Sequence, residues 1–305
     1  MVVQVVRGKR SGPTLCVAAG IHGDEINGVE IVRRLLRQKS LARLRGTLIA
    51  VPVVNVFGFI QQTRYLPDRR DLNRSFPGSE RGSLAARLAH LFMNEVIAHC
   101  DYCIDLHTAA VHRTNLPQIR ATLNGNEEVT RLARAFGAPV IIDSKVREGS
   151  LREATLARGI PLILYEAGEA LRIDDIPVRA GVRGTLSVMR EIGMLAKSSS
   201  RRKRHQPTIA IDSSWVRATG SGMLQSNVKL GALVREGDLL GRLMNPYGEG
   251  EHRIVSEVEG IVIGMTQIPL LNEGDAAFHV AEVKRPMAVE KAVEAFQGEY
   301  TNAEG

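Results

Sequence analysis

The sequence has few aromatic residues, few cysteines and no long apolar run, and each shortage excludes a class of protein. Aromatic residues make up 4% of the 305 residues, which leaves little for stacking on nucleic-acid bases. Three cysteines, an odd number, argue against a disulfide framework and favour a reducing cytoplasm. No run approaches the roughly 20 apolar residues of a membrane-crossing helix, and the N-terminal MVVQVVRGKRSG reverses the order of a signal peptide. We therefore expect a cytoplasmic protein with no membrane partner.

Acidic residues are outnumbered by basic ones, 33 to 40, which raises nucleic acid as a partner. The net charge is +7 and the isoelectric point is near 9.6. Most of the positive charge is spread through helical segments such as IVRRLLRQKSLARLR, where it fits a solvated helix face. The one dense cluster, RRKRH at 201–205, has the composition of a linker. With so few aromatic residues, we expect no nucleic-acid partner.

The first two thirds of the chain alternate between strand-like and helix-like segments. TLCVAAG at 14–20 is a continuous apolar run, and a segment with helical spacing follows it. GTLIAVPVVN at 46–55 is a second strand, and SLAARLAHLFMNEVIA at 83–98 carries the apolar stripe of an amphipathic helix. Strands that alternate with helices predict an α/β fold, with a mixed sheet flanked by helices.

The texture of the sequence changes after the basic linker. From about 207 to 285 the segments are short, β-rich and punctuated by glycine, and no convincing helix interrupts them. We therefore predict three parts: an α/β domain at 1–200, a small all-β domain at 201–290 and a tail at 291–305. The run VKLGALVREGDLLGRL is similar to the barrel-sandwich pattern of biotinyl and lipoyl carriers, but the following MNPYGEGEHR lacks their lysine. A carrier function is therefore not expected.

Two potential metal ligands stand where the first buried strand ends. In GIHGDEINGVE, His22 and Glu25 are three residues apart at the start of a helix, so both side chains can converge on one point. The carboxyl end of such a strand faces the usual ligand crevice, and imidazole and carboxylate are natural zinc ligands. The alternative is a helix N-terminus whose acidic residues complement the helix dipole.

A third potential ligand, His107, ends the strand in IDLHT and is expected at the same rim of the sheet. A catalytic zinc commonly takes three protein ligands, and Asp105, on the same side of the strand, can orient the His107 ring. Cys100 and Cys103 offer an alternative with His107, but a structural zinc site needs four ligands and no second pair is visible. We therefore join His107 to the upstream pair.

The loop TRYLPDRRDLNRSFPG carries Arg64, Asn73 and Arg74. Arginine grips carboxylates in bidentate fashion, and asparagine adds a donor and an acceptor. The alternative is an exposed turn held by local side-chain bonds. The loop is therefore a candidate for binding a substrate carboxylate.

Glu166 ends the buried apolar strand in PLILYEAGE. An acid in that position is costly unless it has a function or a partner. Beside a metal site it can act as a general base. The alternative is a carboxylate that caps the next turn or pairs with an arginine.

Together these motifs resemble the succinylglutamate desuccinylase/aspartoacylase family of zinc carboxypeptidase-like hydrolases. The matching stretches are GIHGDEINGVE, RYLPDRRDLNRSFPG, IDLHTAAVHRTNLPQIR and LILYEAGE, which follow the family's order over most of residues 14–170. The resemblance implies a zinc-carboxypeptidase-like sheet followed by a β domain that shapes the mouth of the active site. It also implies one zinc ion (Zn2+) per chain, bound by His22, Glu25 and His107.

The resemblance further implies a zinc-dependent deacylase that removes the acyl group from a small N-acyl amino acid. In this reading Glu166 is the general base, Arg64 stabilises the oxyanion, and the substrate is bound by Asn73, Arg74, Arg113 and Asn115, with His112 in the same stretch. Tyr165 and Tyr247 are candidates for the family's substrate-binding tyrosine. The alternatives are a metallo-carboxypeptidase or cell-wall peptide amidase, and a non-catalytic zinc-stabilised binding module. The sequence leaves open whether the protein forms a homo-oligomer.

Overall fold

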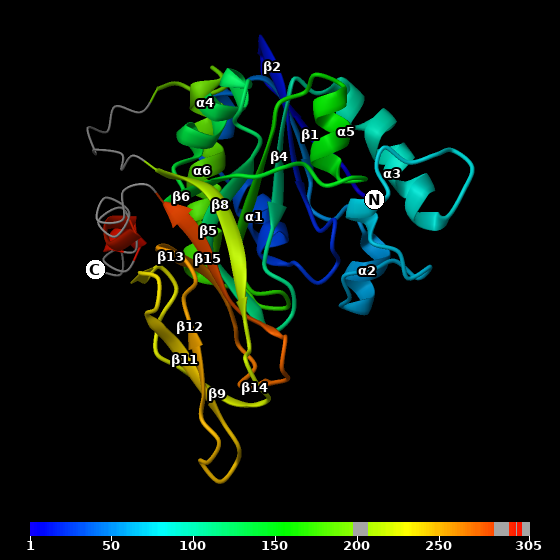
Figure 1. Ribbon diagram of the computed structural model, residues 1–305. Helices are drawn as coiled ribbons and strands as arrows, with labels where there is room; N and C mark the ends of the chain where they lie inside the picture. The colour runs from blue at the N-terminus through cyan, green and yellow to red at the C-terminus, as the bar shows by residue number, and fades with distance from the viewer. Residues whose placement is uncertain (198–206, 284–292, 297, 301–305) are drawn as a thin grey trace.

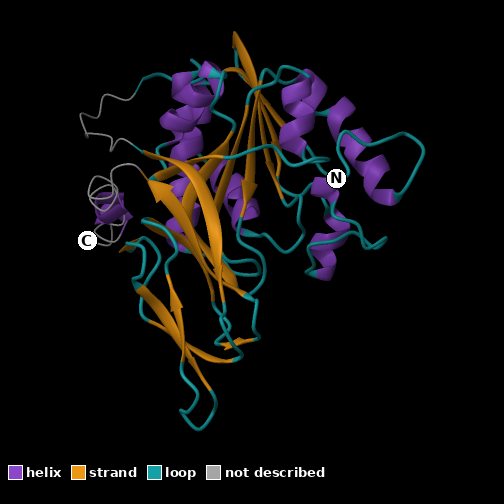
Figure 2. Cartoon of the chain, in the orientation of Figure 1, coloured by secondary structure: helices purple, strands orange, loops and turns teal. Residues whose placement is uncertain are grey.

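The computed structural model describes residues 1–197, 207–283, 293–296 and 298–300. The basic cluster at 201–205 and most of the tail at 291–305 lie outside the described residues, so the predictions made for them stay untested. No helix in the described part of the chain is both long and apolar enough to cross a membrane. Figures 1 and 2 show the arrangement of the elements.

A large mixed sheet organises the chain and confirms the predicted mixed α/β fold. Its eleven strands run in the order β1-β3-β2-β4-β7-β5-β6-β8-β15-β13-β10. Strands β3, β2, β4 and β7 are parallel neighbours, whereas β5 is antiparallel to β7. The strands are β1 Gln4–Arg7, β2 Arg10–Ala19, β3 Arg45–Val51, β4 Tyr102–His107, β5 Arg113–Ala121, β6 Val140–Asp143, β7 Leu162–Gly168, β8 Thr208–Arg217, β10 Leu233–Val234, β13 Gly260–Thr266 and β15 Ala276–Val283.

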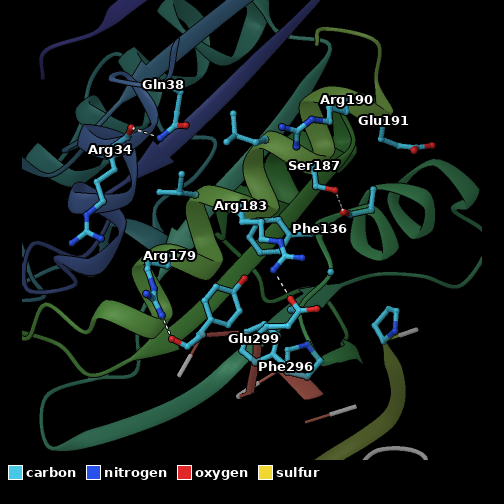
Figure 3. A pocket seen from close by; sticks show the side chains of 18 of the residues that line it. Arg34, Gln38, Phe136, Arg179, Arg183, Ser187, Arg190, Glu191, Phe296 and Glu299 are labelled. Atoms are coloured by element: carbon cyan, nitrogen blue, oxygen red, sulfur yellow. Dashed lines mark hydrogen bonds and ion pairs between the residues drawn. The ribbon is translucent and has the colours of Figure 1, made fainter. Parts of the chain in front are cut away.

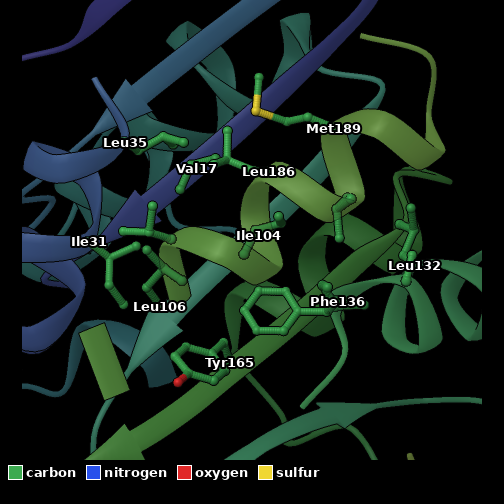
Figure 4. Close-up of a cluster of buried hydrophobic side chains, with 14 of the residues drawn as sticks. Val17, Ile31, Leu35, Ile104, Leu106, Leu132, Phe136, Tyr165, Leu186 and Met189 are labelled. Atoms are coloured by element: carbon green, nitrogen blue, oxygen red, sulfur yellow. The ribbon is translucent and has the colours of Figure 1, made fainter. Parts of the chain in front are cut away.

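Helices cover both faces of this sheet because its central strands are apolar on both sides. Along β2, Leu15 and Val17 join one buried cluster with α1, α4 and α6, while Cys16 joins another with α3 and α5. Figure 4 shows the first cluster, where the Phe136 ring packs near Tyr165. The helices are α1 Asn27–Leu35, α2 Val56–Gln61, α3 Leu84–Glu95, α4 Glu127–Phe136, α5 Leu151–Ala157 and α6 Asp175–Glu191, with short 3₁₀ turns at Lys39–Arg43, Leu72–Arg74 and Ile97–His99.

The C-terminal strands continue the large sheet. Strand β8 pairs in parallel with β6, and β15 pairs with both β8 and β13. Strand β13 then returns to pair with β5, which closes a ring of β5, β6, β8, β15 and β13. A smaller sheet, in the order β12-β11-β9-β14, contains β9 Gly222–Ser226, β11 Leu239–Met244, β12 His252–Val255 and β14 Leu270–Leu271.

Residues 207–283 contain no helix, as expected, but this strand pairing does not confirm a separate all-β domain. The alternation of residues in short strands identifies each strand, but it does not show which other strand it pairs with. The edge of β6 exposes unpaired backbone groups until another strand covers it. Strand β8 fills that edge, so the β-rich segment is built onto the α/β sheet.

Candidate active site

Three buried side chains meet where β2 and β4 end. His22 and Glu25 lie between β2 and α1, and His107 is the last residue of β4, which runs parallel to β2. One ligand atom from each of the three lies within 4.8 Å of the other two. No other group of this kind occurs among the described residues, and Cys100 and Cys103 therefore do not join His107 in one.

The carboxylate of Glu25 lies between the two imidazoles. Its Oε1 is 2.7 Å from His22 Nδ1, and its Oε2 is 2.7 Å from His107 Nδ1. The Thr108 backbone N–H also donates to Oε2, at 3.1 Å. Each histidine therefore directs its Nδ1 into the cluster.

The outer nitrogen of each ring is bound by a further carboxylate. His22 Nε2 lies 3.1 Å from Asp71 Oδ1, and His107 Nε2 lies 2.9 Å from Asp105 Oδ2. A carboxylate on the outer nitrogen fixes the ring orientation and leaves the Nδ1 lone pair free for a metal. Two inward imidazole nitrogens and a carboxylate are a donor set that fits zinc. Sequence reasoning proposed the Asp105 contact but missed Asp71.

Charges within the cluster change its acid–base properties. Burial acts to raise the pKa of Glu25, but His22 and His107 outweigh it and hold that pKa well below its ordinary value. Burial acts to lower the pKa of His107, but Asp105 and Glu25 raise it well above its ordinary value. The cluster without metal is thus a tight ion-paired group, and a bound cation would replace its protons.

Arg64 lies directly against this group. Its Nη1 donates to Glu25 Oε1 at 3.1 Å, and its Nε and Nη2 donate to Asp71 Oδ2 at 3.2 and 3.0 Å. Burial acts to lower the pKa of Arg64, but Glu25 and Asp71 raise it overall. A charged guanidinium is therefore fixed beside the three potential ligands.

A cavity of about 660 Å³ opens over the cluster. All nine residues predicted for the site line it: His22, Glu25, Arg64, Asn73, Arg74, His107, Arg113, Asn115 and Glu166. His112 is not among the lining residues. Its backbone adopts φ 65° and its N–H donates to Glu169 Oε1 at 3.2 Å.

The loop that carries Asn73 and Arg74 is fixed by its own hydrogen bonds. The Asn73 N–H donates to Asp71 Oδ1 at 2.8 Å, and Asn73 Oδ1 accepts from the Leu151 N–H at 2.9 Å. Arg74 Nη1 donates to the Asn73 carbonyl at 2.5 Å. The loop thus combines the local turn bonds of the alternative interpretation with a place on the cavity wall.

Glu166 on β7 lies opposite His107 in the strand register. Its Oε2 accepts from Arg120 Nε at 2.5 Å and from Gln118 Nε2 at 3.1 Å. Glu166 thus lines the cavity and also pairs with an arginine, as the alternative interpretation expected, and its role as a general base stays a prediction. Neither Arg120 nor Gln118 was singled out from the sequence.

The C-terminal strands supply one wall of the cavity. Trp215 on β8 stacks on His279 of β15, with ring centroids 4.7 Å apart and planes 11° apart. The Arg113 guanidinium lies 4.9 Å from the centroid of the Trp215 ring. Burial, together with Arg120 and other arginines, lowers the pKa of His279 to about 3. A sequence pattern could not reveal this wall, because it depends on which strands pair.

The two candidate tyrosines do not line the cavity. Tyr165 is buried in the core and its hydroxyl donates to the Pro177 carbonyl at 2.9 Å. Tyr247, in the turn between β11 and β12, is 88% exposed. The aromatic side chain on the cavity wall is instead Trp215.

A second cavity, of about 880 Å³, lies along α1, α4 and α6 (Figure 3) and contains none of the predicted site residues. Several of its polar side chains already have partners within the chain. Arg183 pairs with Glu299, and Ser187 donates to the Ala135 carbonyl at 2.5 Å. This groove carries no chemistry comparable to the first cavity.

The chain is similar to known proteins over nearly its whole length. Residues 11–192 match the model of the succinylglutamate desuccinylase/aspartoacylase catalytic domain. The chain is 29% identical to N-alpha-acetyl-L-2,4-diaminobutyric acid deacetylase from Halomonas elongata, over 92% of this chain and 85% of that protein. A succinylglutamate desuccinylase/aspartoacylase structure from Rhodobacter sphaeroides superimposes with a TM-score of 0.82 at 26% identity, covering 92% of this chain and 89% of that one. The product-bound structure of the ectoine utilization protein EutE (DoeB) from Ruegeria pomeroyi superimposes with a TM-score of 0.82 at 25% identity. It covers 92% of this chain and 88% of that one.

Proposed function

This chain belongs to the succinylglutamate desuccinylase/aspartoacylase family, and from that membership we propose that it hydrolyses the amide bond of an N-acyl amino acid. The observation that carries the proposal is the cluster of His22, Glu25 and His107 at the base of one cavity. Arg64 and Glu166 line the same cavity. The relative from Halomonas elongata is named as a deacetylase of an N-acetyl amino acid, which supports this reaction class.

We assign His22, Glu25 and His107 as the ligands of one zinc ion. When bound there, zinc would act as a Lewis acid and lower the pKa of water to about 7. Asp71 and Asp105 keep the two imidazoles turned so that Nδ1 faces the ion. The chain's own side chains supply the remaining chemistry.

Glu166 is the general base in this proposal. It removes a proton from the attacking water and later delivers that proton to the leaving amine. Arg64 lies beside Glu25, where its guanidinium stabilises the oxyanion that forms as the amide carbon becomes tetrahedral. Asn73 and Arg74 bind the substrate's α-carboxylate, with Arg113 and Asn115 further along the wall.

The charge of the cavity favours an anionic substrate. Seven cationic side chains line it, against the four carboxylates of Glu25, Asp143, Glu166 and Asp212, an excess of three. Burial, together with Arg120 and Arg147, lowers the pKa of Arg152 to about 10. Crowded positive charges are relieved by a ligand with several carboxylates. We therefore propose an N-acylated dicarboxylic amino acid as the preferred substrate.

In this proposal the β-rich C-terminal segment restricts access to the site, and the protein works in the cytoplasm, where its three free cysteines stay reduced. The test is a panel of N-acetyl and N-succinyl amino acids assayed beside short peptides, with zinc-loaded protein and detection of the released amine. We expect release from N-acyl amino acids. Release from peptides alone would overturn the proposal in favour of a peptidase.

A further inference from the structure

Gln118 and Arg120, two side chains of β5, donate hydrogen bonds to Glu166, the proposed general base. Strands β5 and β7 are antiparallel, with Gln118 opposite Glu166 and Arg120 opposite Leu164. Residues two apart on a strand project from the same face, so both β5 side chains lie on the face of Glu166. Both donate to the same oxygen, Oε2.

The side-chain amide of Gln118 donates to Glu166, while its own oxygen receives no hydrogen bond from any described residue. Gln118 is fully buried, and its Oε1 has no hydrogen-bond partner among the described residues. An unpaired buried acceptor is destabilising because it has lost its hydrogen bonds to water. The reversed amide would place an oxygen against the Glu166 carboxylate, where only a donor is tolerated. The orientation of Gln118 is therefore set by Glu166.

We propose that Arg120 and Gln118 are positioning residues that fix Glu166 in its working conformation, with Oε2 held by β5 and Oε1 facing the reaction. This inference rests on the proposed function, because it takes Glu166 as the base. Oε1 has no partner in the described part of the chain, whereas Oε2 has two. A charge-assisted bond and a second donor on one oxygen restrict rotation of the carboxylate, and a base that is already aligned loses less entropy on reaction.

A rival role for Arg120 is direct binding of the substrate. The cavity is rich in arginine, and Arg120 uses only Nε to hold Glu166, so its two Nη groups have no partner within the described residues. The two roles predict different kinetics. A positioning residue acts on turnover through Glu166, whereas a substrate-binding residue changes KM whether or not Glu166 is present.

The test is a double-mutant cycle on zinc-loaded protein with the best substrate of the panel. General bases typically contribute 10²–10⁴-fold in rate, so we expect R120Q and Q118M each to lower kcat by about tenfold or more, with KM within about twofold. Added to E166Q, either substitution should cause no further loss. R120K, which keeps a charged donor, should recover part of the turnover.

Arg152→Gln is the matched control, because Arg152 lines the same cavity but donates to Ser144 Oγ and the Lys145 carbonyl, not to Glu166. It should change KM, and its effect should persist in E166Q. Melting temperature and zinc content, measured for every variant, separate misfolding from misalignment. If R120Q does not fold, the double-mutant cycle is made with Q118M and E166Q instead.

Two results would overturn the inference in different ways. Losses in R120Q that multiply with those of E166Q, or that appear only in KM, would end the positioning role and leave the proposed function standing. Wild-type turnover in E166Q would remove the base itself, and the positioning role with it.

Discussion

Asp71 and His22 are 49 positions apart in the sequence, yet Asp71 Oδ1 lies 3.1 Å from His22 Nε2. The other oxygen of Asp71 accepts from Arg64, and Oδ1 also accepts from the Asn73 N–H. One carboxylate therefore ties a proposed zinc ligand, the proposed oxyanion group and the proposed substrate loop together. The geometry of the site depends on this residue although it is not among the residues that line the cavity.

Asp71→Asn should weaken zinc binding. Loss of a carboxylate that orients a metal-bound histidine typically costs 10–100-fold in metal affinity, and we expect a loss in that range in a competition titration against a chromophoric chelator. Asp68→Asn is the control, because Asp68 lies in the same loop but accepts from backbone N–H groups of Arg70 and Ala85. Equal affinities for the two variants would contradict the role given to Asp71.

Arg64→Gln should lower kcat by about a hundredfold or more, the usual effect of removing a group that stabilises a developing oxyanion. Zinc content should stay near one per chain, since Arg64 contacts the proposed ligand Glu25 and is not itself assigned as a ligand. Steady-state kinetics and metal analysis of the same preparation measure both quantities. Unchanged kcat with zinc bound would remove Arg64 from the chemistry.

The substrate charge can be read from a comparison of three N-acetyl amino acids. We expect kcat/KM to fall by about tenfold or more from N-acetylaspartate to N-acetylalanine, and again to N-acetyl-diaminobutyrate, because the crowded arginines repel an amine. Arg152→Gln should reduce the differences in kcat/KM among the three substrates. A preference for the diaminobutyrate compound would show that the chain shares the substrate named for its relative.

His279 should make the protein less stable in mild acid. It is 4% exposed and its pKa is lowered to about 3 by burial, with Arg120, Arg147 and Arg113 adding to the shift. The unfolded chain takes up a proton near pH 6.5 whereas the folded chain does not, so stability is lost as the pH falls below about 6.5. The slope is on the order of 1 kcal/mol per pH unit.

His279→Gln removes this titration, so the difference in unfolding free energy between wild type and variant should shrink as the pH falls from 7 to 5. Trp215, which stacks on the ring, reports the same transition by fluorescence. Denaturant titrations at several pH values measure it. Parallel curves for the two proteins would mean that His279 does not stay neutral in the fold.

The meeting of His22, Glu25 and His107 could be predicted from the sequence because parallel strands end at a common rim. The apolar runs before His22 and His107 identify two buried strands, and the carboxyl ends of such strands lie together. The separation of three residues then brings Glu25 to the same point. The meeting of the three side chains also requires that the two strands be neighbours in the sheet, as β2 and β4 are.

The partners of these residues could not be found in the same way. The contact between Arg120 and Glu166 depends on the register of β5 against β7, and the wall around Trp215 depends on β8 pairing with β15. Register is set by the packing of the whole sheet, and a shift of one residue would turn these side chains to the other face. For the same reason, the sequence could not show that β8 pairs with β6 and joins the β-rich segment to the large sheet.

The central claim is that His22, Glu25 and His107 hold one zinc ion. Anomalous diffraction at the zinc edge from crystals of zinc-loaded protein tests it most directly. The account predicts a single strong peak, bounded by His22 Nδ1, His107 Nδ1 and the Glu25 carboxylate. A peak elsewhere in the chain, or fully loaded protein with none between these three side chains, would contradict it.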